Sequence, residues 1–152
     1  MAASRVKDMD IRRARPDDST RIAELEENCF SDPWSKKDVL SYICSEDGMC
    51  FVALDDGVPI AYVLGRIIAP EGEIYRIAVE EDRRGRGIGY RLLSFALKTE
   101  RGRGLESVFL EVRKSNIPAR KLYRSYGFRE ISERKNYYKN PIEDAVIMLL
   151  GQ

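Results

Sequence analysis

The chain has 152 residues, a length typical of one domain with a hydrophobic core of its own. Its 26 basic and 25 acidic residues almost cancel, so the composition gives no support for bulk binding to nucleic acid or to an anionic membrane. Histidine is absent, which excludes histidine-based catalysis and removes the commonest metal ligand, so we expect no bound metal.

The first third of the chain predicts one strand and two helices. Residues 1–9 are expected to be a loosely ordered polar lead-in without the apolar core of a signal peptide. Asp10–Ala14 can form a strand, and the Pro-Asp-Asp sequence that follows marks the start of an amphipathic helix over Asp18–Cys29. Ser35 is the expected N-terminal cap of a second helix over about Lys36–Ser45. No apolar run is long enough to span a bilayer, so we expect a cytoplasmic protein.

The rest of the chain alternates strands with helices. The predicted strands are Cys50–Leu54, Ile60–Ile68, Glu73–Val79, Ser107–Val112, Arg129–Tyr138 and Asp144–Leu150, and the predicted helices are Gly89–Arg101 and Pro118–Tyr126. The order β-αα-β-β-β-α-β-α-β-β predicts a single α/β domain over residues 1–152 with a mixed, mostly antiparallel sheet. The strands on either side of the long helix should be parallel and joined by a right-handed crossover.

Two groups of residues are expected to have no functional role. The three cysteines, Cys29, Cys44 and Cys50, lack the paired spacing of a zinc site, and we expect them to be reduced and mostly buried. Five arginines are expected to be solvated surface charges: Arg12, Arg13, Arg101, Arg103 and Arg113.

The stretch Ile74–Tyr90 combines a strand, an acidic turn, a glycine-rich loop and the start of a helix. The loop reads Arg84-Gly85-Arg86-Gly87-Ile88-Gly89. The first amides of a helix have no internal partner and glycines allow close approach, so residues 85–90 could hold a phosphate with Arg84 and Arg86 adding charge. The alternative is a solvated basic turn. No Gly-Lys-Ser/Thr follows, which excludes a P-loop, and the sequence around the loop is a poor dinucleotide fingerprint.

Glu111 stands inside the otherwise apolar strand sequence Leu110-Glu111-Val112-Arg113. Its carboxylate could face solvent or pair with Arg113. It could instead act as a general base that removes a proton from an attacking amine, because in a chain without histidine a glutamate is a natural group for this role.

These features resemble the GNAT acetyltransferases over nearly the whole chain, from Ile11 to Leu149. Arg84, Gly87 and Gly89 fit the acyl-CoA signature Arg/Gln-x-x-Gly-x-Gly/Ala. The chain resembles in particular the bacterial RimI-type ribosomal-protein alanine N-acetyltransferases. This second likeness is carried by Asp32-Pro33-Trp34-Ser35, Ile77-Ala78-Val79, Leu110-Glu111-Val112-Arg113, Ser115-Asn116, Leu122-Tyr123, Gly127-Phe128, Arg134-Lys135-Asn136-Tyr137-Tyr138 and Glu143-Asp144-Ala145.

The resemblance implies a GNAT fold with about four helices, in which two central parallel strands splay apart and hold acetyl-CoA as the co-substrate. Pantetheine would hydrogen-bond to Ile77, Ala78 and Val79, since a splayed strand edge has free backbone groups, and the pyrophosphate would lie on Gly85–Tyr90. A backbone N–H near Val79 would hold the reaction's oxyanion. Asn116 matches a residue of the family that contacts the cofactor. On local grounds it could equally cap the following helix, and both roles are compatible.

The resemblance also assigns catalytic and acceptor-binding residues. Glu111 would be the general base, and Tyr123 would be the general acid that protonates the departing CoA thiolate. On spacing alone, Tyr123 could instead be a core aromatic residue. Three further aromatic residues would border the acceptor groove, with packing at core or edge positions as the alternative: Trp34, Tyr137 and Tyr138.

The implied reaction is transfer of acetyl from acetyl-CoA to the α-amino group of a protein N-terminus, by direct attack in a ternary complex. The RimI-type resemblance implies the N-terminal alanine of ribosomal protein S18 as the acceptor, with no nucleic acid or membrane as a partner. Two alternatives stay open. One is a GNAT enzyme for a small amine or a lysine side chain, and the other is a non-catalytic acyl-CoA-binding module, against which the presence of Glu111 and Tyr123 argues.

Overall fold

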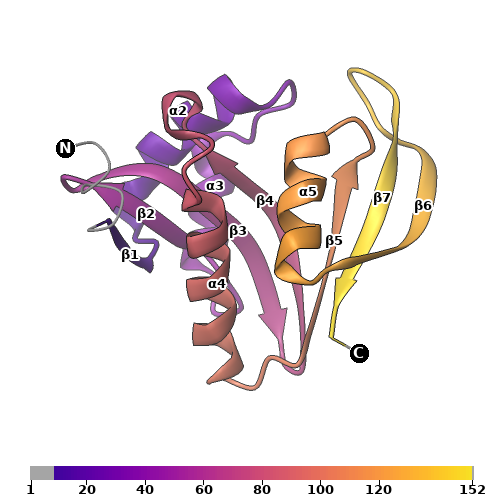
Figure 1. Ribbon diagram of the computed structural model, residues 1–152. Coiled ribbons are helices and arrows are strands. Elements are labelled where there is room, and N and C mark those ends of the chain that lie inside the picture. Colours follow the sequence, from indigo (N-terminus) through magenta and orange to yellow (C-terminus); the bar gives the residue numbers. More distant parts are fainter. Residues whose placement is uncertain (1–8, 152) are drawn as a thin grey trace.

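The computed structural model describes residues 9–151, which form a seven-stranded sheet with helices on both faces (Figure 1). The strands are β1 (Asp10–Arg13), β2 (Phe51–Asp55), β3 (Val58–Ile68), β4 (Glu71–Val79), β5 (Ser107–Arg113), β6 (Arg129–Tyr138) and β7 (Glu143–Leu150). The helices are α2 (Ser19–Cys29), α3 (Lys36–Cys44), α4 (Ile88–Arg101) and α5 (Ile117–Tyr126), with short 3-10 helices η1 (Pro16–Asp18) and η2 (Glu81–Arg83). The predicted element order is confirmed.

Local signals in the sequence set several of these boundaries. The Ser35 hydroxyl accepts a hydrogen bond from the Asp38 backbone N–H at 3.1 Å, which caps α3 as predicted. The β2–β3 hairpin turns at Asp56 and Gly57, whose φ angles of 54° and 79° suit the tight turns of hairpins. At the N-terminus, Met9 packs in the core rather than in a loose lead-in. The rest of that predicted lead-in, residues 1–8, lies outside the described residues.

The parallel pair β4–β5 is short, and its two strands then separate. Pairing runs from Glu71 opposite Ser107 to Ile74 opposite Leu110, although β4 continues to Val79. All other neighbouring strands are antiparallel. In Figure 1 the two strands diverge like the arms of a V, with α5 beside β5. The predicted pair of splayed parallel strands is therefore confirmed, and free backbone edges face one another across the opening.

A bulge marks the point where the two strands begin to diverge. Along β4, Ile74 pairs with Gly65 and Arg76 pairs with Leu64, so Tyr75 has no partner in β3. The extra residue reverses which face the following side chains occupy. Arg76 consequently points towards the same side of the sheet as α2, where it approaches Glu26.

Helices cover both faces of the sheet and create two apolar clusters. Helices α4 and α5 pack on one face, where Leu92, Leu93 and Tyr123 join the larger cluster. Helices α2 and α3 pack on the other face with Ile22 and Val39, but over the β1–β4 half only. The opening between β4 and β5 is thus flanked by different helices on its two sides (Figure 1).

The expectation of mostly buried cysteines is wrong for one of them. Cys50 is buried and Cys29 is partly buried, but Cys44 is exposed. Cys44 lies five residues after the buried Val39 on α3, which places it about 140° around the helix from the face that packs on the sheet. All three thiols are free.

The expectation of solvated surface arginines is wrong for Arg12 and Arg113, which are partly buried, whereas Arg13, Arg101 and Arg103 are exposed. Arg12 pairs with the buried Asp18 at 2.8 Å, and Arg13 pairs with the fully buried Glu100 at 2.8 Å. Arg103 also reaches Glu100, and Arg113 pairs with Glu143 at 3.3 Å. Arg13 and Arg103 are therefore exposed at the surface while each pairs with a buried carboxylate. Arg13 and Arg113 pair with residues 87 and 30 positions away, so no local pattern predicts these two contacts. Arg12 and Arg103 pair with residues only 6 and 3 positions away.

Candidate active site

The glycine-rich loop ends as the N-terminus of α4, as the sequence predicts. Gly87 caps the helix in the left-handed conformation, and the first backbone bond runs from the Arg91 N–H to the Gly87 carbonyl. The N–H groups of residues 88–90 therefore have no helical partner and point out of the helix start. Arg84 and Arg86 are both exposed beside them. This geometry favours an anion at the end of the loop.

The glycines of the loop serve two different purposes. Gly85 and Gly87 have φ of +80° and +77°, and a Cβ built on either would meet nothing within 4 Å. The backbone there is open to an approaching phosphate. A Cβ on Gly89 would instead lie 3.1 Å from the Leu122 side chain, so this glycine lets α4 and α5 approach each other. The loop thus fits the pyrophosphate of CoA at Gly85 and Gly87, whereas Gly89 contributes its N–H and close helix packing.

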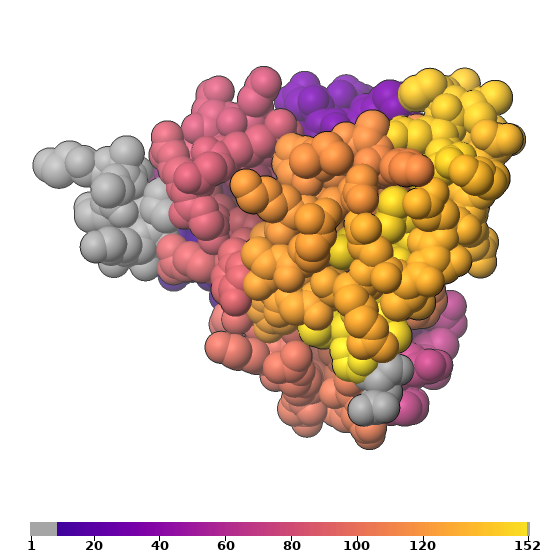
Figure 2. All heavy atoms as spheres, turned by 45° about the vertical axis from the view of Figure 1, so that its right-hand side comes forward, coloured from indigo at the N-terminus to yellow at the C-terminus, as the bar shows by residue number. Residues whose placement is uncertain are grey.

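A pocket of about 350 Å³ connects this loop with the free edge of β4. It is lined by Ile77, Ala78 and Val79 on one side and by Asn116 and Leu122 on the other. In Figure 2 the rose-coloured loop before α4 lies beside the orange α5, on the side of the molecule where this pocket opens. We call it the donor pocket, because it joins the backbone groups expected to hold pantetheine to those expected to hold pyrophosphate.

Arg84 lies across the end of the donor pocket rather than out over the loop. Its Nε donates to the Val79 carbonyl at 2.9 Å, and its Nη2 lies 3.4 Å from the Cys29 sulfur. Pantetheine bonded to the Val79 carbonyl would have to share or displace this contact. The arginine predicted to bind phosphate is therefore in contact with the predicted pantetheine strand in this structure.

A second pocket, of about 290 Å³, opens on the side of the sheet that carries α2 and α3. We call it the acceptor pocket. Ile77, Asn116 and Ala119 line both pockets, so the two meet at the splay between β4 and β5. A donor entering from one face and an acceptor from the other would come together at these residues.

Glu111 lies in the acceptor pocket and is held by two neighbours from β6. Tyr137 donates a hydrogen bond to Oε1 at 3.1 Å, and the Arg134 Nε lies 3.3 Å from Oε2. Oε2 is buried but accepts no well-directed hydrogen bond from any described residue. Glu111 does not pair with Arg113, so that alternative is excluded. One carboxylate oxygen therefore retains free acceptor capacity inside the pocket.

Tyr123 also lines the acceptor pocket and is 4% exposed. Burial, with a smaller contribution from Tyr138, raises the pKa of its hydroxyl. The hydroxyl forms no hydrogen bond with any described residue, although the ring packs on Phe128. Tyr123 is thus a core aromatic residue, as its spacing allows, and it also lines the acceptor pocket with a hydroxyl that keeps its proton.

The remaining predicted site residues frame the junction and the acceptor pocket. Asn116 caps α5 by accepting from the Ala119 N–H at 3.2 Å, which confirms the local prediction while leaving it exposed to both pockets. Trp34 stacks on Tyr42 with ring centroids 4.8 Å apart. Burial and the Glu111 charge raise the pKa values of Tyr137 and Tyr138. All three aromatic residues predicted to border the acceptor groove line the acceptor pocket.

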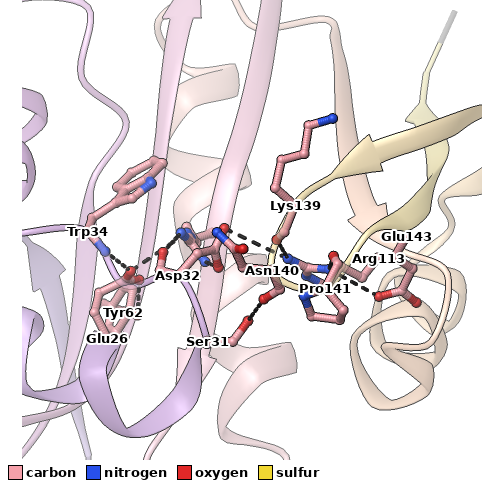
Figure 3. Close-up of polar contacts among 11 residues, drawn as sticks. Glu26, Ser31, Asp32, Trp34, Tyr62, Arg113, Lys139, Asn140, Pro141 and Glu143 are labelled. Carbon is pink, nitrogen blue, oxygen red and sulfur yellow. Dashed lines mark hydrogen bonds and ion pairs between the residues drawn. The ribbon is translucent and has the colours of Figure 1, made fainter.

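Two loops meet at the rim of the acceptor pocket (Figure 3). The Ser31 hydroxyl, after α2, donates to the Asn140 carbonyl in the β6–β7 loop at 3.1 Å. Arg113 donates to the Lys139 and Pro141 carbonyls at 2.8 Å and 2.9 Å. Its guanidinium also lies 4.0 Å from Asp32 in the first loop. We call these contacts the rim clasp. The clasp joins α2, β5 and the β6–β7 hairpin into one wall.

The buried carboxylate of Glu26 holds the loop after α2, which is part of the same wall of the acceptor pocket. Glu26 is fully buried on α2 and accepts from the Trp34 N–H at 2.8 Å and from the Tyr62 hydroxyl (Figure 3). Arg76 lies 3.7 Å from Glu26 and stacks between the Phe30 and Trp34 rings, at 4.2 Å and 4.9 Å from their centroids. These contacts hold the loop that carries Trp34.

Sequence reasoning missed several residues of this pocket. Arg134, which pairs with Glu111, appeared only within a motif, and Glu73 and Arg76 were not singled out. A charged residue inside an apolar strand is the signal that identified Glu111, and the same signal applied to β4 would have found Glu73 and Arg76. The sequence could not predict that Glu73 and Arg76 lie on the same face of the sheet, because the bulge at Tyr75 breaks the alternation of side chains between the two faces.

The fold and the two-pocket site define a class of enzyme that comparison with known proteins identifies. Residues 19–128 match the model of the Acetyltransferase (GNAT) family. The chain belongs to this family, which confirms the GNAT fold and acetyl-CoA as the co-substrate.

Similar proteins within the family indicate a particular subfamily. The [ribosomal protein bS18]-alanine N-acetyltransferase of Escherichia coli strain K12 is 34% identical over 128 residues, which cover 83% of this chain and 86% of that protein. The N-alpha-acetyltransferase RimI of Mycobacterium tuberculosis strain H37Rv is 38% identical over 137 residues, covering 86% of this chain and 85% of that protein. The resemblance to RimI-type enzymes is therefore confirmed.

Solved structures agree with these relatives. The crystal structure of the ribosomal-protein-S18-alanine N-acetyltransferase from Escherichia coli has a TM-score of 0.87 at 32% identity, covering 94% of this chain and 93% of that one. The Arabidopsis thaliana NAA60 structure in complex with acetyl-CoA shares the fold at 18% identity, with a TM-score of 0.85 and coverage of 95% and 99%. Within residues 9–151, no helix has the length and apolar character needed to cross a bilayer.

Proposed function

We propose that this chain, acting as a single domain, acetylates the N-terminal α-amino group of ribosomal protein bS18 at its alanine. The observation that carries the proposal is that Glu111 and Tyr123 both line the acceptor pocket, which shares Ile77, Asn116 and Ala119 with the donor pocket. The names of the relatives supply the acceptor. Such a reaction takes place on a ribosomal protein and is therefore cytoplasmic.

Glu111 is proposed as the general base. Tyr137 and Arg134 fix its carboxylate, Glu111 lines the acceptor pocket, and Oε2 accepts no well-directed hydrogen bond from any described residue. The amine nitrogen attacks the thioester carbonyl, and its proton passes to Glu111 directly or through water. An α-amino group has a pKa of about 7.7–8.0, against about 10.4 for lysine, so a much larger fraction of it is already neutral near neutral pH.

Tyr123 is proposed as the general acid. As the carbon–sulfur bond breaks, the thiolate takes the phenolic proton, and the pKa raised by burial keeps that proton on Tyr123 until then. The negative charge on the carbonyl oxygen is proposed to be held by a backbone N–H near Val79, at the free edge of β4. Pantetheine along Ile77–Val79 and pyrophosphate on Gly85–Tyr90 would place the thioester at the junction.

The proposal is tested by supplying acetyl-CoA and three acceptors in parallel. The first is a peptide with the N-terminus of bS18, the second is the same peptide with a blocked N-terminus and a free lysine, and the third is a polyamine. Mass spectrometry should show one acetyl group on the first peptide and none on the second. A higher kcat/KM for the polyamine or for the lysine peptide would overturn the proposed acceptor.

A further inference from the structure

We propose that Asp144 is a positioning residue for the general base, because it holds a bulge in β6 that turns the Tyr137 hydroxyl onto Glu111. The inference rests on the proposed function, since it assumes that Glu111 takes the proton of the amine. Asp144 lines neither pocket, so it would touch neither substrate and would act only through Tyr137.

The bulge interrupts β6 where the strand reaches the acceptor pocket. The register of β6 against β7 shifts between Arg134 and Tyr138, so that three residues of β6 lie opposite Asp144 alone. In a regular strand Tyr137, three positions after Arg134, would lie on the other face of the sheet. Across the bulge, Tyr137 and Arg134 instead both reach the Glu111 carboxylate, at 3.1 Å and 3.3 Å. The base therefore depends on the bulge for one of its two holding contacts.

The two carboxylate oxygens of Asp144 both bind residues of the bulge. Oδ1 accepts from the Asn136 backbone N–H at 2.9 Å, and Oδ2 accepts from the Lys135 Nζ at 3.1 Å. Asn136 has φ of +55°, in the left-handed region that asparagine tolerates better than most residues. This turn of the backbone comes directly before Tyr137, so the bond to the Asn136 N–H fixes the direction in which Tyr137 leaves the bulge.

Asp144 is itself anchored to the segment that follows β5. Its backbone carbonyl accepts from the Lys114 N–H at 3.1 Å. The carboxylate of the neighbouring Glu143 accepts from the Ser115 N–H at 2.6 Å. Because β5 carries Glu111, the bulge and the base are held on one support.

The test compares Asp144→Ala with Asp144→Asn, since asparagine keeps an acceptor oxygen for the Asn136 N–H and alanine does not. Asp144→Ala should lower kcat on the bS18 peptide by about 10- to 100-fold, because misplacing a catalytic group by about 1 Å can cost this much. The dissociation constant of acetyl-CoA should not change. Asp144→Asn should restore kcat to nearly the wild-type value.

Amide hydrogen exchange measured by NMR reports on the bulge without any substrate. The Asn136 N–H should be protected in the wild type and in Asp144→Asn, and should exchange at least about tenfold faster in Asp144→Ala. An Asn136 amide that stays protected in Asp144→Ala, or a kcat that stays at the wild-type value when this protection is lost, would overturn the role of Asp144.

A double-mutant cycle measures whether Asp144 acts through Tyr137. Tyr137→Phe removes the hydroxyl that binds Glu111, so in that background Asp144→Ala should lower kcat by no more than about a further twofold. A general loss of folding stability would act independently of the hydroxyl. Equal fold-losses with and without the Tyr137 hydroxyl would therefore show that Asp144 is not a positioning residue.

Glu133→Gln is the matched control. Glu133 is a carboxylate of β6 that pairs with Lys114 at 3.1 Å, the same distance as between Asp144 and Lys135, but it precedes the bulge and lines neither pocket. Its loss should change neither kcat nor the exchange of the Asn136 amide. If the wild-type enzyme left the bS18 peptide unacetylated, the proposed function would be wrong, while the exchange rates would still decide whether Asp144 holds the bulge.

Discussion

At the scale of single residues, the candidate active site divides its work between two groups that differ in how they are held. Glu111 is fixed by Tyr137 and Arg134, whereas the Tyr123 hydroxyl is free of partners within the described chain. A base must be aimed at one nitrogen, while an acid needs freedom to reach a leaving sulfur. The difference in their surroundings fits the difference in their proposed roles.

Glu111→Gln and Tyr123→Phe should each lower kcat by about 10²–10⁴-fold, the usual contribution of a positioned acid or base. Both changes preserve shape, so acetyl-CoA binding should stay near normal when measured by calorimetry. Steady-state kinetics on the bS18 peptide gives the comparison. If both variants turned over at the wild-type rate, the roles assigned to these two residues would be wrong.

The site residues that could be predicted from sequence are those whose chemistry is visible locally. Glu111 was evident as a charge inside an apolar strand, and Gly87 as a glycine between a strand and a helix. Arg76 and Arg113 could not be assigned in this way. Their roles depend on strand register and on partners from distant segments, such as the carbonyls of Lys139 and Pro141 that Arg113 binds.

At the scale of elements, a single substitution at the start of α4 can test the predicted phosphate site. A side chain added at Gly87 would project into open space at the mouth of the donor pocket. Gly87→Glu places bulk and negative charge where the pyrophosphate should lie, so acetyl-CoA affinity should fall by at least about 100-fold in calorimetry, a loss of about 2.7 kcal/mol.

The control for Gly87→Glu is Gly57→Glu in the β2–β3 hairpin. Gly57 has φ of +79° and equally open surroundings, against +77° for Gly87, but it lines neither pocket. Each variant should lose about 1 kcal/mol of stability through the strained φ. Only the Gly87 variant should lose acetyl-CoA. Normal binding by Gly87→Glu would contradict the phosphate site at this loop.

The rim clasp predicts a separate effect on the acceptor. Arg113→Gln removes the donors that hold the β6–β7 loop, which carries Lys139 and Pro141 just after Tyr137 and Tyr138. We expect KM for the peptide to rise by about tenfold, because one charge-assisted contact is worth about 1.5–3 kcal/mol, while the dissociation constant of acetyl-CoA stays the same.

Arg120→Gln is the matched control for the clasp. Arg120 also bonds a carbonyl, that of Lys114, and a carboxylate, that of Glu130, but on the outer side of α5. Its loss should leave both substrates unaffected. An unchanged peptide KM in Arg113→Gln would show that the acceptor wall does not depend on the clasp.

The element order and the splayed pair were predictable because strands and helices alternate with clear periodicity around the glycine loop. The exact point at which β4 diverges from β5 could not be predicted from the sequence. It depends on where Ile74 stops pairing with Leu110 and on the bulge at Tyr75, and both arise from packing between distant strands.

At the scale of the whole molecule, the short edge strand β1 is fixed to both helical layers by adjacent arginines. Arg12 pairs with Asp18 at the start of α2, and Arg13 pairs with Glu100 at the end of α4 while stacking over Phe51 at 4.6 Å. A four-residue strand paired only with β2 buries little by itself. These ion pairs between partly exposed arginines and buried carboxylates therefore connect the sheet edge to both layers, although burial of the carboxylates offsets part of their gain.

The Asp18 pair gives stability a defined dependence on pH. Burial acts to raise the pKa of Asp18, but hydrogen bonds from Arg12 and the Arg15 N–H outweigh it, so the pKa is lowered overall. A carboxylate with a lowered folded pKa adds stability that is fully present above the unfolded value, about 3.9, and is lost as pH falls through the folded value.

Asp18→Asn should therefore reduce the free energy of unfolding by about 2 kcal/mol at pH 7 and pH 5, and by less at pH 3. Urea denaturation at the three pH values measures the difference. Asp17→Asn is the control. The Asp17 carboxylate is next to Asp18 in sequence but is exposed, so its loss should change the free energy of unfolding little at any of the three pH values. A loss of equal size at pH 7 and pH 3 would mean that Asp18 stabilises the fold by shape rather than by its charge.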